Sequence, residues 1–226
     1  MKSILTPVTK QDVLEVYARF SEAEHEYQKA MWESELAMIN RSDLPCRLVD
    51  WARVKSWMDV GCGTGTLFER VDLLGVKIPH AVGIDISNDM LRFAREKKFQ
   101  TLQPEWILAD FEGLAGMPEQ VDLITLMGVL QICGIHQEKA LGIVANLLAP
   151  GGQFYMTTVS ADWKDIQDGT FELPPKFSAF SSKELVQILD ACGIEVFQMS
   201  GFLAEENKFV DVTENHSFFI YGRKRG

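Results

Sequence analysis

The chain has 226 residues, of which 46% are hydrophobic and 24% charged, as in a single globular domain rather than a disordered or fibrous chain. Its net charge of −10 disfavours nucleic acid and anionic membranes as main partners. No membrane span or secretory leader is evident, and the four cysteines (Cys46, Cys62, Cys133 and Cys192) lack metal-binding spacing. We therefore expect a cytoplasmic protein with reduced thiols and no metal.

The first predicted element is helical. Apolar side chains recur at helical spacing from Thr9 to Ile39, which predicts one long helix or two shorter ones. The segment from Ser42 to Pro45 is expected to break this helix, and a short helix could follow from Cys46. Residues 1–45 are thus interpreted as a helical cap on the domain that follows.

Beyond this cap, predicted strands alternate with predicted helices. The strands cover residues 56–60, 80–85, 105–109, 121–126, 153–159, 195–199 and 216–221. Helices are expected over 66–73, after an N-cap at Ser87, and along an apolar stripe from 140 to 148 that Pro150-Gly151-Gly152 ends. A last helix is expected to begin with a capping box formed by Ser181 and Glu184.

This alternation predicts an α/β fold with a doubly wound, mostly parallel, seven-stranded sheet and helices on both faces. The last strand is expected to be antiparallel, because no helix separates residues 199 and 216. We predict one domain, 1–226. It comprises the cap (1–45), a ligand-binding core (46–159), a lid-like insertion (160–180) and a C-terminal completion of the sheet (181–226).

A glycine-rich turn follows the first strand. In open α/β sheets, ligands bind at the carboxyl ends of the strands, and the glycines from Gly61 to Gly65 let the backbone approach a ligand closely. Asp85 ends the second strand, about twenty residues later, where a carboxylate can accept from both hydroxyls of a ribose. The pair predicts a nucleoside-bearing ligand, although such a turn can also serve tight packing alone.

Charge indicates which nucleoside this is. Thr66 occupies the position of the third glycine of a dinucleotide-binding turn, and no lysine of a phosphate-binding loop is near. Asp59 precedes the turn and would oppose a pyrophosphate while suiting a cation, unless it only caps the next helix. S-adenosylmethionine carries a sulfonium and an ammonium group. Asp110, at the end of the third strand, could accept from its adenine amino group.

At these positions the sequence resembles the class I S-adenosylmethionine-dependent methyltransferases. The resemblance rests on five segments in the family's order, between about residues 56 and 159. They read Met-Asp-Val-Gly-Cys-Gly-Thr-Gly (58–65), Gly-Ile-Asp-Ile-Ser (83–87), Ala-Asp-Phe (109–111), Val-Asp-Leu-Ile leading into Met-Gly-Val-Leu-Gln (121–131), and Leu-Leu-Ala-Pro-Gly-Gly (147–152). The combination is far more specific than the glycine turn alone.

The resemblance implies a place for the methionine portion of the cofactor. The turn from Gly61 to Gly65, including Cys62 and Gly63, would line that portion. Asp59 would hold the ammonium group, directly or through water. Because reactivity does not follow from this placement, Cys62 is interpreted as a lining residue only.

The resemblance also implies a place for the nucleoside. Asp85 would bind the ribose hydroxyls and Ile86 would pack on the adenine. The segment Ala109-Asp110-Phe111 would read the adenine edge through the Asp110 carboxylate and the Phe111 amide.

By the same resemblance, Met127, Gly128 and Gln131 would lie near the reactive methyl group. A general base is needed only for some acceptors, so the catalytic candidates are weakly specified. They are His136, Gln131 as an orienting hydrogen-bond group, and Tyr17.

Other reactive residues receive structural interpretations. His80 and His216 fall in predicted strands, and Cys133 lacks the preceding proline of a cytosine-C5 nucleophile. The sequence also lacks the motif by which exocyclic-amine DNA methyltransferases end their fourth strand.

The acceptor is inferred mainly by exclusion. The insertion at 160–180 is rich in aromatic residues and proline, and it could cover an apolar acceptor. We expect a small, partly apolar or aromatic acceptor methylated by in-line displacement, and a monomer or homodimer. A protein or RNA methyltransferase and a non-catalytic S-adenosylmethionine-binding partner remain alternatives, whereas a dehydrogenase is disfavoured by Thr66 and Asp59.

Overall fold

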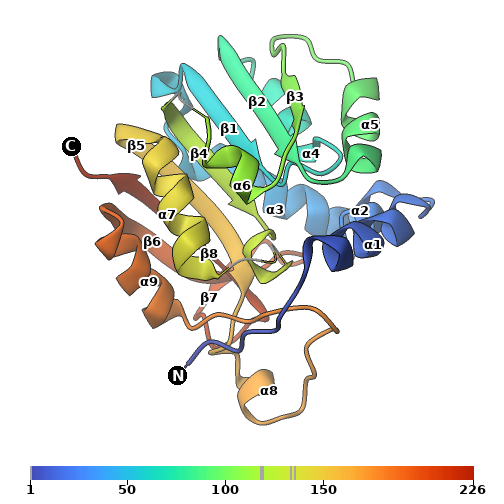
Figure 1. Ribbon diagram of the computed structural model, residues 1–226, viewed down its shortest axis with the longest axis vertical. Coiled ribbons are helices and arrows are strands. Elements are labelled where there is room, and N and C mark those ends of the chain that lie inside the picture. The colour runs from blue at the N-terminus through green and yellow to red at the C-terminus, as the bar shows by residue number, and fades with distance from the viewer. Residues whose placement is uncertain (1, 118–119, 133, 135) are drawn as a thin grey trace.

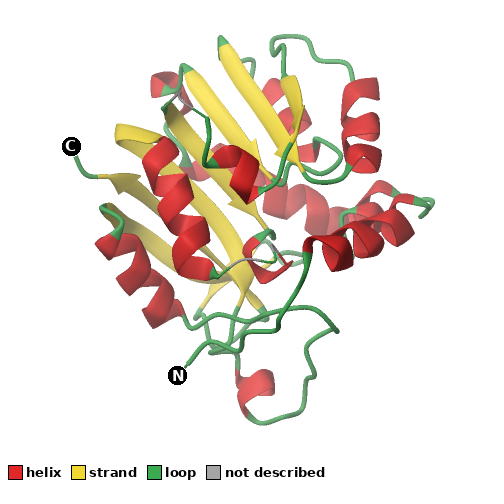
Figure 2. Cartoon of the chain, in the orientation of Figure 1, coloured by secondary structure: helices red, strands yellow, loops and turns green. Residues whose placement is uncertain are grey.

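A computed structural model describes residues 2–117, 120–132, 134 and 136–226, so Cys133 lies outside the described residues. It contains one eight-stranded sheet with helices on both faces (Figures 1 and 2). The strands are β1 (Ser56–Val60), β2 (His80–Asp85), β3 (Glu105–Leu108), β4 (Val121–Met127), β5 (Leu148–Val159), β6 (Ile194–Leu203), β7 (Lys208–Val210) and β8 (Ser217–Lys224).

The strand order is β3-β2-β1-β4-β5-β8-β6-β7. The first five strands of this order, β3 to β5, pair in parallel. Strand β8 lies between β5 and β6 and is antiparallel to both, which confirms the prediction for the last strand. The predicted seven strands are present with one addition: β7 forms a three-residue antiparallel hairpin arm on β6. The order changes direction at β1 and β4, and in such sheets this switch point is where ligands bind.

Described helical segments precede, connect and follow these strands. The α-helices are α1 (Lys10–Ser21), α2 (Glu26–Lys29), α3 (Glu35–Leu48), α4 (Thr66–Asp72), α5 (Asn88–Glu96), α6 (Phe111–Leu114), α7 (Gln137–Leu147), α8 (Lys164–Gln167) and α9 (Ser182–Ala191). Two short 3-10 turns, Trp51–Arg53 and Leu130–Ile132, complete the described helical segments. No helix among the described residues is long and apolar enough to cross a membrane.

Side-chain alternation along the strands builds a core on each face of the sheet. On β5, Phe154 and Met156 join a cluster that contains Leu141 of α7 and Leu189 of α9. Tyr155, between them in sequence, faces the opposite cluster, where α3, α4 and α5 pack. Burial of both strand faces explains the near-continuous apolar runs in the sequence.

The N-terminal segment differs from the prediction. It forms three helices rather than one or two, and α3 continues through Pro45, where a break was expected. Pro45 lies in the last turn of α3, so its missing N–H costs only one late helical hydrogen bond. Leu44 and Pro45 are both buried, and this burial keeps the segment helical.

Two predicted helix boundaries also need correction. Ser181 is the N-cap of α9, but its side chain makes no cap hydrogen bond, so the predicted capping box is wrong. Glu184 instead accepts from the Ser3 backbone N–H (2.9 Å) and hydroxyl (2.6 Å), which ties the chain's start to α9. After α7, the chain enters β5 directly at Leu148, earlier than the predicted 153.

Candidate functional site

The glycine turn lies at the carboxyl end of β1 and leads into α4. Gly61 and Gly63 have φ of +73° and +54°, a backbone region that favours glycine. A Cβ at Gly61 would collide with the Val129 side chain, whereas a Cβ at Gly63 would meet no atom within 4 Å. Gly61 therefore serves internal packing, while Gly63 leaves open space beside the backbone, as a cradle for a ligand requires.

Asp85 at the end of β2 is tied to this turn. Its Oδ2 accepts from the Gly63 N–H at 2.8 Å and its Oδ1 from the Ser87 N–H at 2.8 Å. The side chain is 5% exposed, and burial raises the pKa of Asp85 to about 6 although the backbone hydrogen bonds oppose the rise. Asp85 thus joins the turn to the start of α5.

Asp59 is a second buried carboxylate near the turn. It is 3% exposed, and its Oδ1 accepts from the Thr125 hydroxyl at 2.5 Å. Burial raises the pKa of Asp59 to about 7, the Thr125 hydrogen bond opposes the rise, and the charge of Asp85 adds to it. Both carboxylates line one pocket, termed here the turn pocket, so a cation entering it would stabilise their ionised forms.

The turn pocket gathers residues predicted for the methionine portion, the ribose and the reactive methyl group, but not Gly65, which packs against Trp106 and Ala94. It has a volume of about 120 Å³. Its predicted lining residues are Tyr17, Asp59, Gly61, Cys62, Gly63, Asp85, Met127, Gly128 and Gln131. Burial, together with the charges of Asp85 and Asp59, raises the pKa of the Cys62 thiol well above its usual range, so Cys62 is not a poised nucleophile.

Tyr17 reaches the site from α1. Burial, and then the charge of Asp85, raise the pKa of the Tyr17 hydroxyl far above its ordinary value. The hydroxyl therefore stays protonated, which suits a hydrogen-bond donor and not a general base. Tyr17 lines the turn pocket, and a catalytic role for it stays a prediction.

A narrow apolar slot continues from the turn pocket past Asp85. Its lining includes the predicted nucleoside residues Ile86, Ala109, Asp110 and Phe111. Asp110 is the N-cap of α6, and its Oδ2 pairs with Lys10 of α1 at 2.7 Å. The hydrogen bond from Lys10 lowers the pKa of Asp110, so this carboxylate stays charged. Its Oδ1 accepts from the backbone N–H groups of Glu112 and Gly113 at the start of α6.

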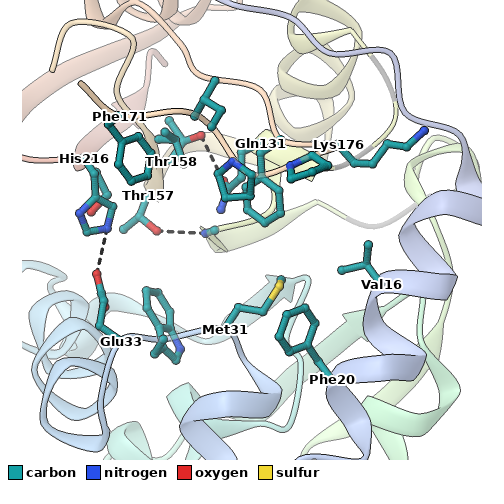
Figure 3. A pocket seen from close by; sticks show the side chains of 18 of the residues that line it. Val16, Phe20, Met31, Glu33, Gln131, Thr157, Thr158, Phe171, Lys176 and His216 are labelled. Atoms are coloured by element: carbon teal, nitrogen blue, oxygen red, sulfur yellow. Dashed lines mark hydrogen bonds and ion pairs between the residues drawn. The ribbon is translucent and has the colours of Figure 1, made fainter. Parts of the chain in front are cut away.

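A larger cavity of about 630 Å³, called here the large cavity, lies next to the turn pocket (Figure 3). Residues that line both are Met31, Trp32, Gly128, Gln131 and Phe177. Its walls combine side chains of α1, including Val16 and Phe20, with the insertion segment from Phe171 to Phe177. The insertion predicted as lid-like therefore contributes one wall.

His136 does not join this arrangement. It is the N-cap of α7, its side chain is 53% exposed, and its Nδ1 lies 3.5 Å from Glu138. It lines another hollow, with the segment from Leu5 to Thr9, and this hollow shares Gln131 and Lys176 with the large cavity. His136 lines neither the turn pocket nor the large cavity, so the geometry gives no support to its catalytic role and agrees with an ordinary surface histidine.

Sequence reasoning missed a polar cluster in the wall of the large cavity. Glu33, Arg41 and His216 meet there, and Glu33 Oε1 accepts from Arg41 at 3.0 Å and from His216 at 2.9 Å (Figure 3). His216 had been interpreted as structural. Nothing in the sequence signals the cluster, because its members are separated by up to 183 residues.

Known proteins resemble this chain in sequence and structure. A family described as "Methyltransferase domain" matches residues 58–152. A ubiquinone biosynthesis O-methyltransferase of Aeromonas salmonicida is 29% identical over 178 residues, which cover 70% of this chain and 72% of that protein. Against further proteins of this name, from Azoarcus and Burkholderia vietnamiensis, the match spans about half of their length (46% and 47%).

Solved structures share the fold. The N-methyltransferase NodS from Bradyrhizobium japonicum, solved with S-adenosyl-L-homocysteine, superposes with a TM-score of 0.64 at 16% identity, covering 94% of this chain and 98% of NodS. The [4+2]-cyclase SpnF gives a TM-score of 0.69 at 17% identity, with 100% and 99% coverage. The fold thus accommodates more than one named activity, and the chemistry must be argued from the site.

Proposed function

Since the chain belongs to the class I S-adenosylmethionine-dependent methyltransferases, we propose that it methylates a small, partly apolar acceptor bound in the large cavity. The observation that carries this proposal is the junction of two pockets. Trp32, Gly128 and Gln131 line both the turn pocket and the large cavity. A donor in the first and an acceptor in the second would meet at these residues.

The residues of the turn pocket fit S-adenosylmethionine. The open space at Gly63 would take the methionine portion, and the two buried carboxylates, Asp59 and Asp85, suit a ligand with cationic groups. We assign the ammonium group to Asp59 and the ribose hydroxyls to Asp85. When bound, the cofactor supplies an electrophilic methyl group on a sulfonium, a reagent that needs no further activation.

The apolar slot suits an adenine ring. Ile86 and Phe111 offer apolar contact, and Ala109 and Asp110 lie at the same strand end. Because Lys10 and the α6 cap already engage the Asp110 carboxylate, we assign Asp110 mainly to positioning this edge. The adenine amino group would use its remaining acceptor capacity.

For the transfer itself, the chain's contribution is alignment and exclusion of water. The aromatic residues Phe20, Phe171 and Phe177 supply apolar walls. Gln131, whose Oε1 accepts from the Thr158 hydroxyl at 3.2 Å, is held at the junction and can orient the acceptor. Similarity to proteins named O-methyltransferases supports an oxygen atom as the methylated position.

The proposal is tested in two steps on the purified protein. Calorimetry should show binding of S-adenosylhomocysteine and much weaker binding of NAD. A panel of small phenols, amines and thiols, with peptide and RNA arms, is then incubated with S-adenosylmethionine and read by mass spectrometry for a 14 Da gain. Methylation of a small acceptor supports the proposal. Methylation of only the peptide or RNA, or tighter binding of NAD, would overturn it.

A further inference from the structure

The wall of the large cavity holds a polar cluster that the proposed function has not used. Glu33 lies just before α3, Arg41 lies within α3, and His216 precedes β8, so two segments far apart in the chain bring the cluster together (Figure 3). The Glu33 and His216 side chains are 43% and 36% exposed, so both are accessible from the cavity. Elsewhere the wall is largely aromatic or aliphatic, as at Val16 and Phe171.

The charges inside the cluster balance. Burial acts to raise the pKa of Glu33, but the hydrogen bond from His216 and the charge of Arg41 bring it down to about 2, so the carboxylate stays ionised. Arg41 donates through one nitrogen to Glu33 and through the other to the Ser217 hydroxyl at 2.5 Å. One carboxylate and one guanidinium oppose each other here, so the cluster itself carries no net charge. Arg19 and Lys176 are the other charged lining residues of the cavity, and Lys176 pairs with Asp12 at 3.0 Å.

Hydrogen-bonding capacity is left over at His216. His216 Nε2 has two neighbours, Glu33 Oε1 at 2.9 Å and Arg41 Nη2 at 3.4 Å. We assign the proton to Nε2 because the contact with Glu33, which can only accept, is the shorter one. In the neutral imidazole Nδ1 then carries a lone pair. Among the described residues no hydrogen bond reaches His216 Nδ1. Thr158 and Gln131, other polar residues of the cavity, hydrogen-bond to each other. His216 lines the cavity, and its Nδ1 is an acceptor that no described side chain engages.

We propose that His216, oriented by Glu33, binds an uncharged hydrogen-bond donor of the acceptor molecule, such as a hydroxyl group. This rests on the proposed function and narrows its acceptor. His216 and Glu33 line the large cavity but do not line the turn pocket, so the group held there is distinct from the atom that is methylated. Glu33 is a positioning residue: it fixes the tautomer and orientation of the ring.

The physical consequence is selectivity. A ligand that donates a hydrogen bond satisfies Nδ1, whereas an apolar or capped analogue excludes water and leaves Nδ1 unpaired, which is costly. A purely structural role, in which the cluster only holds α3 against β8, would make no such distinction. Ligand preference, and not stability, therefore separates the two readings.

The test uses two simple probes, 4-propylphenol and 4-propylanisole, which differ by one methyl cap on the oxygen. Each is titrated calorimetrically at pH 8 into the protein saturated with S-adenosylhomocysteine. The phenol should bind at least about tenfold more tightly than the anisole. His216→Phe keeps a ring of similar size without nitrogen and should reduce this preference to less than about twofold. Arg19→Met, which removes another charge from the same cavity wall, should retain the preference.

Equal binding of the two probes to the wild type, binding of neither, or a preserved preference in His216→Phe would overturn the inference. Should His216→Phe fail to fold, Glu33→Gln serves instead, because it removes the charge that fixes the tautomer, and an unchanged preference would count against the inference. Binding of S-adenosylhomocysteine is measured first. Its absence would contradict the proposed function, whereas its presence without probe preference contradicts only this inference.

Discussion

The hydroxyl of Thr64 in the glycine turn donates to the carboxylate of Glu26 in α2 at 2.6 Å. The same Glu26 oxygen, Oε1, also accepts from the Thr66 hydroxyl at 2.7 Å and from the Lys97 ammonium at 2.5 Å. One carboxylate therefore joins α2, the turn and the end of α5. Figure 1 shows α1 and α2 beside the carboxyl ends of β1 and β2, where the turn lies. The N-terminal helices are thus fastened directly onto the predicted cofactor site.

This fastening predicts the effect of Glu26→Ala. Loss of the shared carboxylate should loosen α2 from the turn and weaken binding of S-adenosylhomocysteine about five- to tenfold, because each lost charge-assisted bond is worth on the order of 1 kcal/mol or more. Calorimetry on the variant measures this, with Glu24→Ala as a control on the same segment. An unchanged dissociation constant for Glu26→Ala would show that the contact of α2 with the turn does not contribute to cofactor binding.

Asp85→Ala should weaken binding of S-adenosylhomocysteine more strongly, by about 10- to 100-fold. The variant removes the proposed ribose partner and also frees the Gly63 N–H that now donates to Asp85. Asp89→Ala, which removes an exposed carboxylate from the first turn of α5, is the matched control and should bind normally. If both variants bind the ligand as the wild type does, Asp85 has no ribose role.

Two glycine variants should separate packing from ligand binding. Gly63→Ala places a methyl group in open space, so it should lower cofactor affinity at least about tenfold with a destabilisation of only about 1 kcal/mol from the positive φ. Gly61→Ala collides with Val129 and should instead lower the melting temperature markedly. Calorimetry and thermal melting on both proteins give the comparison. Normal cofactor affinity in Gly63→Ala would show that the open space beside Gly63 does not hold the cofactor.

The pKa of Asp59 has a consequence for stability. In the fold it is raised to about 7 from an ordinary value of 3.8, so between about pH 4 and 7 the folded protein holds a proton that the unfolded chain has lost. Asp59 therefore lowers the free energy of unfolding progressively as the pH rises through that window. Asp59→Asn should raise the melting temperature at pH 8 by about 3 °C or more, with little change at pH 4.

Differential scanning fluorimetry of both proteins across pH 4–8, without ligand, measures this difference. Parallel curves for wild type and variant would show that the Asp59 carboxylate carries no such penalty. The same variant should bind S-adenosylhomocysteine more weakly, because it loses the proposed partner of the ammonium group.

Much of the site was predictable because its signals are local. A glycine at positive φ, an acid at the end of a strand and a serine N-cap depend on a few neighbouring residues, and Ser87 indeed accepts from the Met90 N–H. A parallel sheet then brings its strand ends to one edge, so Asp85, Asp110 and the glycine turn had to lie close together. The sequence alone therefore determined the fold class, the parallel sheet and the placing of most candidate residues at one edge of that sheet; their cofactor roles stay predictions.

The tertiary structure decided what depends on distant partners. Helix α3 runs through Pro45 because its face is buried, and Glu184 receives Ser3 in place of the predicted cap. His216, predicted to be structural, lines the large cavity with Glu33, while the weakly specified candidate His136 is largely exposed. These outcomes follow from the packing of segments far apart in the chain. Contacts of this kind produce no periodic or local pattern in the sequence, so they could not be predicted from it.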